Sequence, residues 1–393
     1  MTDADLVIVG GGVMGLFTAY HASGAGARVA VLEAGRIGDP RTASYGRTRS
    51  YRRDYLDARY VRLADEAMRL WDGFERDCEV RALVRCGCMN IATEAVSPDL
   101  ADTYGRRSAA TMRALGIECE TLDAGRLKER FGYLRADEAH LDAAAGLIDL
   151  AAVTGALVRV LAGRGVAVHE NVEVTRVVAG ADDVRVGIGT GGELTARALV
   201  ITAGHGTNGI LRRVDGCELQ IPLTRDRPAE ARYYVPEPAE REQFTADAMP
   251  VIAYLDTGVY VHPIVDGVVD AVKIGYYDPP DLPRGRTGVE NIAEFVEQCL
   301  PGLLGARARD VLDVDQCDYD LVADDHFVLG PVPGSPGVTV GVGWRGTGYK
   351  FAPWVGRVLH ELALRRGTVY DIAAFDPARF ARADQLFRTD EVH

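Results

Sequence analysis

Lysine is nearly absent from this sequence of 393 residues. The chain has 44 basic residues, of which three are lysine, at positions 128, 273 and 350, so the other 41 are arginine. An ammonium is more compact than a guanidinium, and its pKa shifts more readily when it is buried. We therefore expect Lys273 and Lys350 to have chemical roles, although three retained surface lysines would be the simpler explanation.

A net positive charge is also lacking. The formal net charge is -13 at pH 7, which argues against general binding to nucleic acid or to a membrane surface. No apolar run approaches the roughly 18 residues of a membrane-spanning helix, and the first residues lack the basic start of a signal peptide. We expect a cytoplasmic protein, monomeric or weakly dimeric, that binds neither nucleic acid nor membrane.

The seven cysteines suggest neither a disulfide framework nor a metal centre. Their number is odd, and Cys86 and Cys88 have no second ligand cluster elsewhere in the sequence, so we expect reduced thiols and no bound metal. Cys317 lies among six aspartates in DVDQCDYDLVADDHF, residues 313–327. Because acidic neighbours disfavour a thiolate, Cys317 is not expected to act as a free nucleophile.

Glycines near the start follow the pattern of a dinucleotide-binding unit. An apolar strand leads into a glycine turn and a helix, and a second strand ends at Glu33. Gly12 would let the backbone approach a pyrophosphate at the helix N-terminus, and Glu33 would accept hydrogen bonds from ribose hydroxyls. The candidate cofactor-binding residues of this unit are Gly10, Gly12, Val13, Met14, Gly15 and Glu33.

A basic segment follows at once. Residues 35–55 contain six arginines, and Asp39 is the only acid before Asp54. We expect this segment to surround an anionic cofactor or to capture an anionic substrate through guanidinium contacts. A solvated loop and a nucleic-acid-binding arm are the alternatives.

The remaining pattern predicts an α/β (α+β) fold with two domains. Strand and helix signals of nucleotide-binding type recur late in the chain, whereas residues 221–316 alternate like strands and are punctuated by prolines. We expect a discontinuous Rossmann-like dinucleotide-binding domain formed by 1–85, 150–220 and 320–393. A substrate domain with a mixed or antiparallel sheet would comprise 86–149 and 221–319.

As a set, the motifs resemble those of the flavin-dependent amine oxidases of the D-amino-acid-oxidase superfamily. The likeness is greatest to the monomeric sarcosine oxidase group, which includes N-methyltryptophan oxidase and pipecolate oxidase, and it covers essentially the whole chain. The motifs, in order, are VGGGVMG, GRTRSYRRDY, VKIGYY, CDYDLVADDHF and GWRGTGYKFAP. The resemblance implies that the cofactor is FAD.

The resemblance also implies roles for single residues. Arg52 matches the arginine that holds the substrate carboxylate, with Lys350 assisting, and Lys273 matches the lysine that activates oxygen. Cys317 lies where these enzymes attach FAD through an 8α-cysteinyl thioether. The further cofactor-binding candidates are Arg47, Thr48, Arg49, Gly204, Gly346 and Gly348.

Departures from the family pattern concern the substrate. Tyr45 and Tyr277 stand where sarcosine oxidases carry histidines, and Tyr51 replaces a smaller aliphatic residue. A pocket with Tyr51, Tyr260, Tyr277 and Trp344 would suit a larger or flatter amine, although some of these rings could face the core. We expect a substrate other than sarcosine, with a biosynthetic intermediate as one option.

The predicted reaction is oxidation of a secondary or cyclic amino acid to an imine, with reduction of O2 to H2O2. The expected partners are a small amine that bears a carboxylate and O2. A dehydrogenase of the same superfamily that passes electrons to a partner is one alternative. A noncatalytic dinucleotide-binding regulator is the other.

Overall fold

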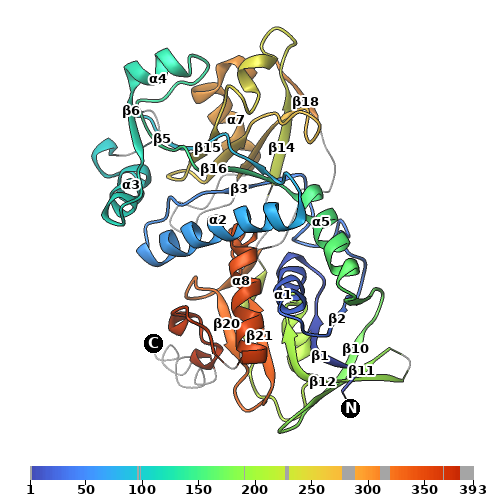
Figure 1. Ribbon diagram of the computed structural model, residues 1–393. Helices are drawn as coiled ribbons and strands as arrows, with labels where there is room; N and C mark the ends of the chain where they lie inside the picture. Colours follow the sequence, from blue (N-terminus) through green and yellow to red (C-terminus); the bar gives the residue numbers. More distant parts are fainter. Residues whose placement is uncertain are drawn as a thin grey trace, which may run out of the picture. The chain divides into compact units, whose positions relative to one another are not determined.

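The computed structural model contains two compact units, each built from separate segments of the chain (Figure 1). The described residues are 2–94, 97, 99–189, 191–225, 230–276, 288–309, 319–365 and 367–380. Unit 1 comprises Met1–Ser44, Thr154–Arg227 and Asp318–His393, and unit 2 comprises Tyr45–Val153 and Pro228–Cys317. Both units are therefore discontinuous in the sequence.

The centre of unit 1 is a parallel sheet. Its strands, in spatial order, are β21 (Val338–Val342), β12 (Gly192–Ile201), β1 (Ala4–Val9), β2 (Val29–Leu32) and β9 (Ala167–His169). β1 and β2 are buried almost throughout, which is typical of parallel strands covered on both faces. Antiparallel strands extend the sheet: β10 (Val174–Ala179) and β11 (Val184–Ile188) beside β12, and β20 (Val328–Pro331) beside β21.

Two helices of unit 1 pack at backbone distance. They are α1 (Val13–Gly24) and α8 (Ala352–His360). A Cβ atom at Gly356 would lie only 2.5 Å from the carbonyl carbon of Phe17, so only glycine allows this approach. The second turn of α1 is thereby fixed against α8.

Unit 2 is built on a large mixed sheet. Its spatial order is β18 (Arg307–Arg309), β14 (Glu230–Val235), β17 (Val272–Tyr276), β16 (Val259–His262), β15 (Val251–Tyr254), β5 (Cys88–Ala92), β7 (Glu138–Asp142) and β6 (Glu120–Asp123). All neighbours are antiparallel except β15 and β5. Together, the two sheets confirm the predicted α/β class with a mixed-sheet second domain.

The two faces of this sheet differ in polarity. One face carries a hydrophobic cluster that includes Ile252, Val261 and Ile274, and α7 (Gly288–Cys299) packs on it through Ile292 and Phe295. Residues at the alternate positions point to the opposite face, because successive side chains of a strand alternate. That second face holds polar residues predicted for the site.

The remaining elements of unit 2 explain where the basic segment belongs. β3 (Thr48–Tyr51) pairs with β8 (Gly146–Asp149), which also pairs with β4 (Leu83–Val84). Residues 45–85 therefore belong to unit 2, whereas the sequence had placed 1–85 in the dinucleotide-binding domain. Local sequence pattern did not reveal this pairing, because the partner strand lies about a hundred residues away.

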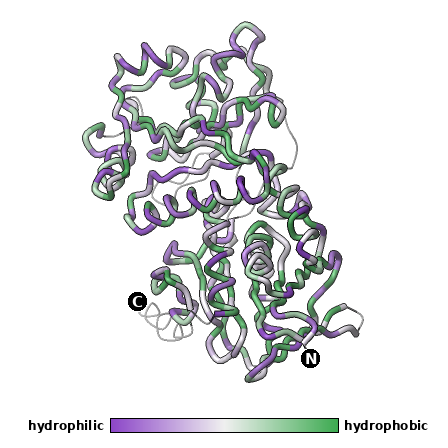
Figure 2. The backbone as a smooth tube through the Cα atoms, viewed as in Figure 1, coloured by the Kyte–Doolittle hydropathy of each residue, from purple (hydrophilic) through white to green (hydrophobic). Residues whose placement is uncertain are grey.

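Helices complete both units. Along α2 (Ala58–Cys78), hydrophilic and hydrophobic stretches alternate (Figure 2), as expected for a helix with one buried face. None of the helices in the described ranges is both long and apolar enough to cross a membrane. The other α-helices are α2 (Ala58–Cys78), α3 (Tyr104–Ala114), α4 (Ala124–Arg130), α5 (Leu150–Gly163) and α6 (Thr207–Leu211).

Candidate functional site

The glycine turn between β1 and α1 depends on two glycines that no other residue could replace. Gly10 has φ of +106°, and a Cβ atom there would lie 2.4 Å from the carbonyl oxygen of Thr202. A Cβ atom at Gly15 would lie 1.9 Å from the carbonyl oxygen of Gly10. These contacts hold the first turn of α1 directly against the ends of β1 and β12, as the predicted dinucleotide-binding unit requires.

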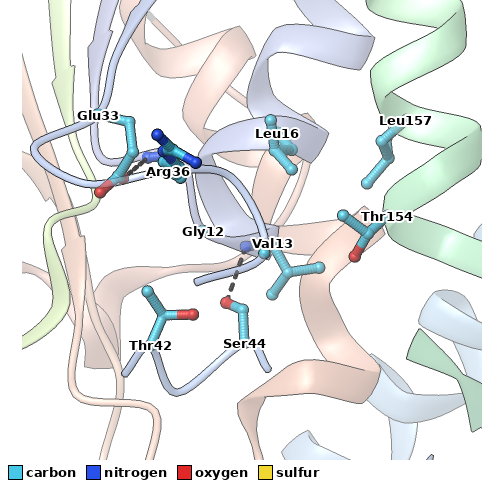
Figure 3. A pocket seen from close by; sticks show the side chains of 11 residues that line it. Gly12, Val13, Leu16, Glu33, Arg36, Thr42, Ser44, Thr154 and Leu157 are labelled. Carbon is cyan, nitrogen blue, oxygen red and sulfur yellow. Dashed lines mark hydrogen bonds between the residues drawn. The ribbon is translucent and has the colours of Figure 1, made fainter. Parts of the chain in front are cut away.

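A pocket opens at the N-terminus of α1 (Figure 3). It contains about 350 Å³ of empty space, part of which is open to solvent. Its lining residues are Gly11, Gly12, Val13, Leu16, Glu33, Arg36, Gly38, Thr42, Ser44, Thr154 and Leu157. All of them belong to unit 1.

Hydrogen bonds organise this pocket. Glu33 accepts from the backbone N–H of Gly11 at 2.6 Å and from that of Gly35 at 2.8 Å. The Ser44 hydroxyl accepts from the N–H of Val13 at 2.9 Å, while Gly12 provides no side-chain cap for α1 (Figure 3). A helix N-terminus with a nearby guanidinium, here Arg36, suits an anionic group, and each Glu33 oxygen keeps a lone pair for hydroxyl donors.

The residues present therefore fit a bound adenine dinucleotide. Of the sequence candidates, Gly12, Val13 and Glu33 line the pocket, whereas Gly10 and Gly15 shape the turn beneath it. Met14 points instead towards the late glycine turn, residues 343–348, because its Cε lies 3.2 Å from the position that a Cβ atom of residue 348 would take.

Sequence reasoning missed several lining residues. Arg36, Thr42 and Ser44 lie inside the basic segment that the sequence had singled out, so the surplus of arginine and hydroxyl residues there was an available signal. Thr154 and Leu157 come from α5 and carried no signal, since only tertiary packing brings that helix to the pocket.

Gly204 lies where two neighbouring parallel strands end. β1 and β12 run in register from Ala4 opposite Ala196 to Val9 opposite Ile201. Gly204 follows β12 by three residues and Gly10 follows β1 directly, so both lie at the same edge of the sheet, and Gly204 has φ of +53°. Carboxyl ends of parallel strands are where open α/β sheets bind their ligands.

The late glycine turn is held by a buried carboxylate. Asp320 accepts from the N–H groups of Gly343 at 2.9 Å and Trp344 at 3.1 Å. Burial raises the pKa of Asp320, while these two hydrogen bonds oppose the rise. Gly346, with φ of +64°, lies under the Tyr319 ring, whose atoms would be 2.4 Å from a Cβ atom. This turn needs glycine for both conformation and space.

Lys350 follows that turn and is buried. Its side chain donates to the Thr347 hydroxyl at 2.7 Å and to the Thr347 carbonyl at 3.1 Å, and the residue is 6% exposed. Gly348, between the two, has its Cβ position 2.4 Å from Trp344. Trp344 in turn packs edge-on against Phe327, with ring centroids 5.3 Å apart, so at least part of its ring serves the core of unit 1.

Strand register brings the unit 2 candidates onto one face. Lys273 on β17 lies directly opposite His262 on β16, and Tyr260 lies opposite Gly275. A Cβ atom at Gly275 would be 2.1 Å from the Tyr260 ring, so this ring lies across the glycine. Lys273 is 2% exposed, and its ammonium lies 5.8 Å from the Tyr233 ring centroid. Lys273 and Tyr260 therefore lie on the same polar face, in cross-strand pairs that follow each other on that face.

β3 crosses towards this same group of residues. The hydroxyls of Thr48 and Ser50 each lie 2.8 Å from a ring nitrogen of His262, Thr48 at Nδ1 and Ser50 at Nε2. Tyr51 belongs to the alternate face of β3, and its surroundings include Arg85, Asp72 and Glu75. The predicted grouping of Tyr51 with Tyr260 is therefore wrong, because strand alternation turns the two side chains apart. His262 itself was missed.

Arg52 is a largely buried cation that forms an ion pair with Asp54. Its guanidinium donates to the Asp54 carboxylate at 2.6 Å and to the Asp54 carbonyl at 3.0 Å. It also lies over the Tyr55 ring, 5.0 Å from the centroid. Burial disfavours the charge, but Asp54 and the neighbouring tyrosines outweigh it and hold the pKa of Arg52 well above its usual value. Asn90 on β5 donates to the other oxygen of Asp54 at 3.1 Å.

Two further arginines of the basic segment, Arg47 and Arg49, donate to backbone carbonyls. Arg49 donates to the carbonyls of Tyr45 at 2.8 Å and Thr48 at 3.2 Å, which closes the turn around Gly46. Arg47 is exposed, and it reaches the Val268 carbonyl at 3.4 Å. Neither contact involves an anion.

Two predicted site residues lie outside the described residues: Tyr277 and Cys317. Arg52, Lys273 and Tyr260 belong to unit 2, whereas Lys350 belongs to unit 1. Within the described ranges, no three or more histidine, cysteine or acidic side chains are grouped as metal ligands.

A parallel sheet with a glycine turn and an anion-accepting pocket defines a dinucleotide-binding protein. Comparison with known proteins identifies the family within this class. The family model described as "FAD dependent oxidoreductase" matches residues 5–362, and the chain therefore belongs to that family. The predicted family, fold class and FAD dependence are thereby confirmed.

Curated relatives match along nearly the whole chain. Mouse peroxisomal sarcosine oxidase is 28% identical over 398 residues, covering 96% of this chain and 96% of that protein. The monomeric sarcosine oxidase of Streptomyces avermitilis is 29% identical, covering 96% and 98%. Among solved structures, NikD, described as an unusual amino acid oxidase essential for nikkomycin biosynthesis, superimposes with a TM-score of 0.75 at 25% identity, covering 95% and 97%.

Proposed function

We propose that this enzyme oxidises the C–N bond of a secondary or cyclic amino acid to an imine, with O2 reduced to H2O2. The observation that carries the proposal is the burial of two of the three lysines. Lys273 is 2% exposed and Lys350 is 6% exposed, in a chain that otherwise uses arginine. Because burying an ammonium is costly, these two are retained for what their charge does. The sarcosine oxidase relatives support the same reaction type.

FAD supplies the two-electron redox chemistry, and the chain supplies binding and electrostatics. Arg52 and Lys350 would bind the substrate carboxylate and so fix the C–H bond next to nitrogen in a reactive orientation. The amine loses a hydride from carbon and a proton from nitrogen. Lys273 would stabilise negative charge that develops on oxygen, which takes up the two electrons and, with two protons, leaves as H2O2.

The cofactor would be held mainly by unit 1. Its glycine turn and pocket would bind the adenine dinucleotide part, and Gly204, Gly346 and Gly348 would let the backbone approach the flavin. From unit 2 we assign Arg47, Thr48 and Arg49 to the cofactor and the mixed sheet to the substrate. A thioether between Cys317 and the 8α carbon of FAD completes the proposal.

The substrate class follows from the polar face of unit 2. Tyr260 and, by sequence, Tyr277 would add aromatic surface beside His262. Arg52 already has Asp54 as a counter-ion, so the carboxylate must compete for it. We therefore favour a planar or cyclic amino acid over sarcosine.

A screen for peroxide release tests the proposal. The purified yellow protein is mixed in air with N-methyl and cyclic amino acids, and H2O2 is measured together with bleaching of the flavin without oxygen. Bleaching and stoichiometric peroxide with one class of amine would support the proposal. Bleaching with electron transfer only to an artificial acceptor would replace it with a dehydrogenase, and a colourless protein would replace it with a regulator.

A further inference from the structure

His262 links two hydroxyls of one strand. Thr48 and Ser50 occupy alternate positions of β3 and so share a face, and each hydroxyl lies 2.8 Å from a different ring nitrogen. The three polar groups form a continuous chain from Ser50 through the imidazole to Thr48. Both distances suit hydrogen bonds with either partner as the donor.

This chain of hydrogen bonds leads from a partly exposed hydroxyl to a buried one. Ser50 is half-buried, whereas Thr48 and His262 are each 1% exposed. Water can therefore reach one end of the chain, while the other end lies inside unit 2. Lys273 is the cross-strand partner of His262, so the buried imidazole in the middle of the chain lies beside the lysine assigned to oxygen reduction.

A neutral imidazole gives the chain a direction. It has one N–H and one lone pair, so one hydroxyl must accept from the ring while the other donates to it. The hydroxyl that accepts keeps its own proton for a partner beyond the chain. On the same sheet face, the ionisable neighbours of His262 are Lys273 on β17 and Tyr260 on β16, and Tyr233 on β14 lies beyond Lys273. A protonated ring would put a second buried cation opposite Lys273, which favours the neutral ring.

We propose that Ser50, His262 and Thr48 form a proton relay between solvent and the reaction site; this inference rests on the proposed oxidase function. When Ser50 gives its proton to Nε2, Nδ1 gives its proton to Thr48, and the Thr48 hydroxyl proton passes inward. Water restores the proton of Ser50. One proton enters, one leaves, no bond to carbon changes, and the ring ends in the opposite tautomer.

The proposed reaction resets this relay in every cycle. Oxidation of a neutral secondary amine to the imine releases one proton from nitrogen, and reduction of O2 to H2O2 takes up one proton besides the hydrogen delivered as hydride. The relay carries the first proton outward and the second inward. Opposite transfers return His262 to its starting tautomer, so no separate rearrangement is needed.

Reoxidation measured without any amine tests the relay. The FAD-loaded protein is reduced with dithionite and mixed with O2 in H2O and in D2O, and the recovery of flavin absorbance is followed. We expect Ser50→Ala and His262→Phe to slow recovery by at least about tenfold and to lower the solvent isotope effect. Ser50→Thr, which keeps the hydroxyl, should restore both. His140→Phe is the matched control, since His140 is another buried histidine that lies 3.2 Å from a hydroxyl, that of Thr121.

Nitrogen NMR of the protein supplies a readout independent of turnover. With ¹⁵N-labelled histidine, the His262 ring should be neutral with one dominant tautomer, and Ser50→Ala should shift its Nε2 signal. Unchanged recovery rates and isotope effects in Ser50→Ala and His262→Phe, or a doubly protonated ring at neutral pH, would overturn the relay. Failure of every amine to bleach the wild-type flavin would instead overturn the proposed function, and the dithionite experiment distinguishes the two results.

Discussion

The guanidinium of Arg52 and the carboxylate of Asp54 form an ion pair at 2.6 Å in which neither side chain is more than 15% exposed. Asn90 holds the second carboxylate oxygen. A substrate carboxylate therefore meets an arginine whose charge is already compensated. This arrangement makes Asp54 a determinant of carboxylate affinity, since two anions close to one cation repel each other.

Replacement of Asp54 tests this competition. Asp54→Asn should bind a simple carboxylate such as benzoate about tenfold more tightly, a change of about 1.4 kcal/mol, measured as a shift of the flavin spectrum. The same variant should lose about 3 kcal/mol of unfolding free energy, because Arg52 loses its buried partner. Asp142→Asn is the control: it removes one of the two carboxylate partners of Arg53 and should destabilise without changing carboxylate affinity. Unchanged or weaker benzoate binding in Asp54→Asn would show that Asp54 does not compete.

Lys273→Met should separate the two halves of the reaction. We expect reoxidation by O2 to slow by about 100-fold, because positive charge at the developing oxygen anion is lost, while reduction by substrate changes far less. Stopped-flow measurements follow each step through the flavin absorbance. Lys128→Met, at the exposed lysine of α4, should change neither step. Equal slowing of reduction and reoxidation would remove Lys273 from its assigned role.

Gly15→Ala should impair FAD binding through sterics alone. The added methyl would lie 1.9 Å from the Gly10 carbonyl oxygen, so the glycine turn must shift, at a cost of about 1–3 kcal/mol. We expect a lower flavin-to-protein absorbance ratio and a lower unfolding temperature. Gly163→Ala, at the end of α5 where a Cβ atom meets nothing within 4 Å, should leave both unchanged. Normal flavin content in Gly15→Ala would contradict the required close approach.

Cys317→Ser should abolish any covalent bond to FAD. The denatured wild-type protein should carry the mass of one FAD, whereas Cys317→Ser should release all of its flavin into an acid supernatant. Cys119→Ser is the control, because burial raises the pKa of that thiol to about 11 and keeps it unreactive. Complete release of flavin by the wild-type protein would make Cys317 an unmodified cysteine.

Acid should destabilise unit 1 through His21. Burial lowers the pKa of His21 from 6.5 to about 4, although its Nε2 donates to the Pro353 carbonyl at 2.9 Å. The unfolded chain then binds a proton between pH 6.5 and pH 4 that the folded protein does not. The contribution of His21 to the free energy of unfolding is fully present above pH 6.5. It should fall by about 3 kcal/mol as the pH drops to 4. Urea unfolding at pH 7 and pH 4.5 should show that His21→Gln loses less unfolding free energy between the two pH values than the wild type does. His205→Gln, at an exposed histidine, is the control and should lose as much as the wild type. An equal loss in His21→Gln and the wild type would exclude His21 as the cause.

Some features of the site were predictable because their causes are local. Gly10, Gly12 and Gly15 with Glu33 predicted the turn and the pocket, since glycine spacing and strand pattern act over about thirty residues. The scarcity of lysine pointed to Lys273 and Lys350, and both are buried. Composition and spacing carried this information without any tertiary contact.

Other features depend on contacts between distant segments. The pairing of β3 with β8 put residues 45–85 in unit 2, and the register of β16 and β17 placed His262 opposite Lys273. His262 belongs to no sequence motif. The face on which Tyr51 lies depends on the register in which β3 pairs with β8. The sequence by itself determined the cofactor class and the glycine turn that shapes the pocket. Only the tertiary structure decided which side chains meet, because strand register and the burial of ion pairs arise from contacts far apart along the chain.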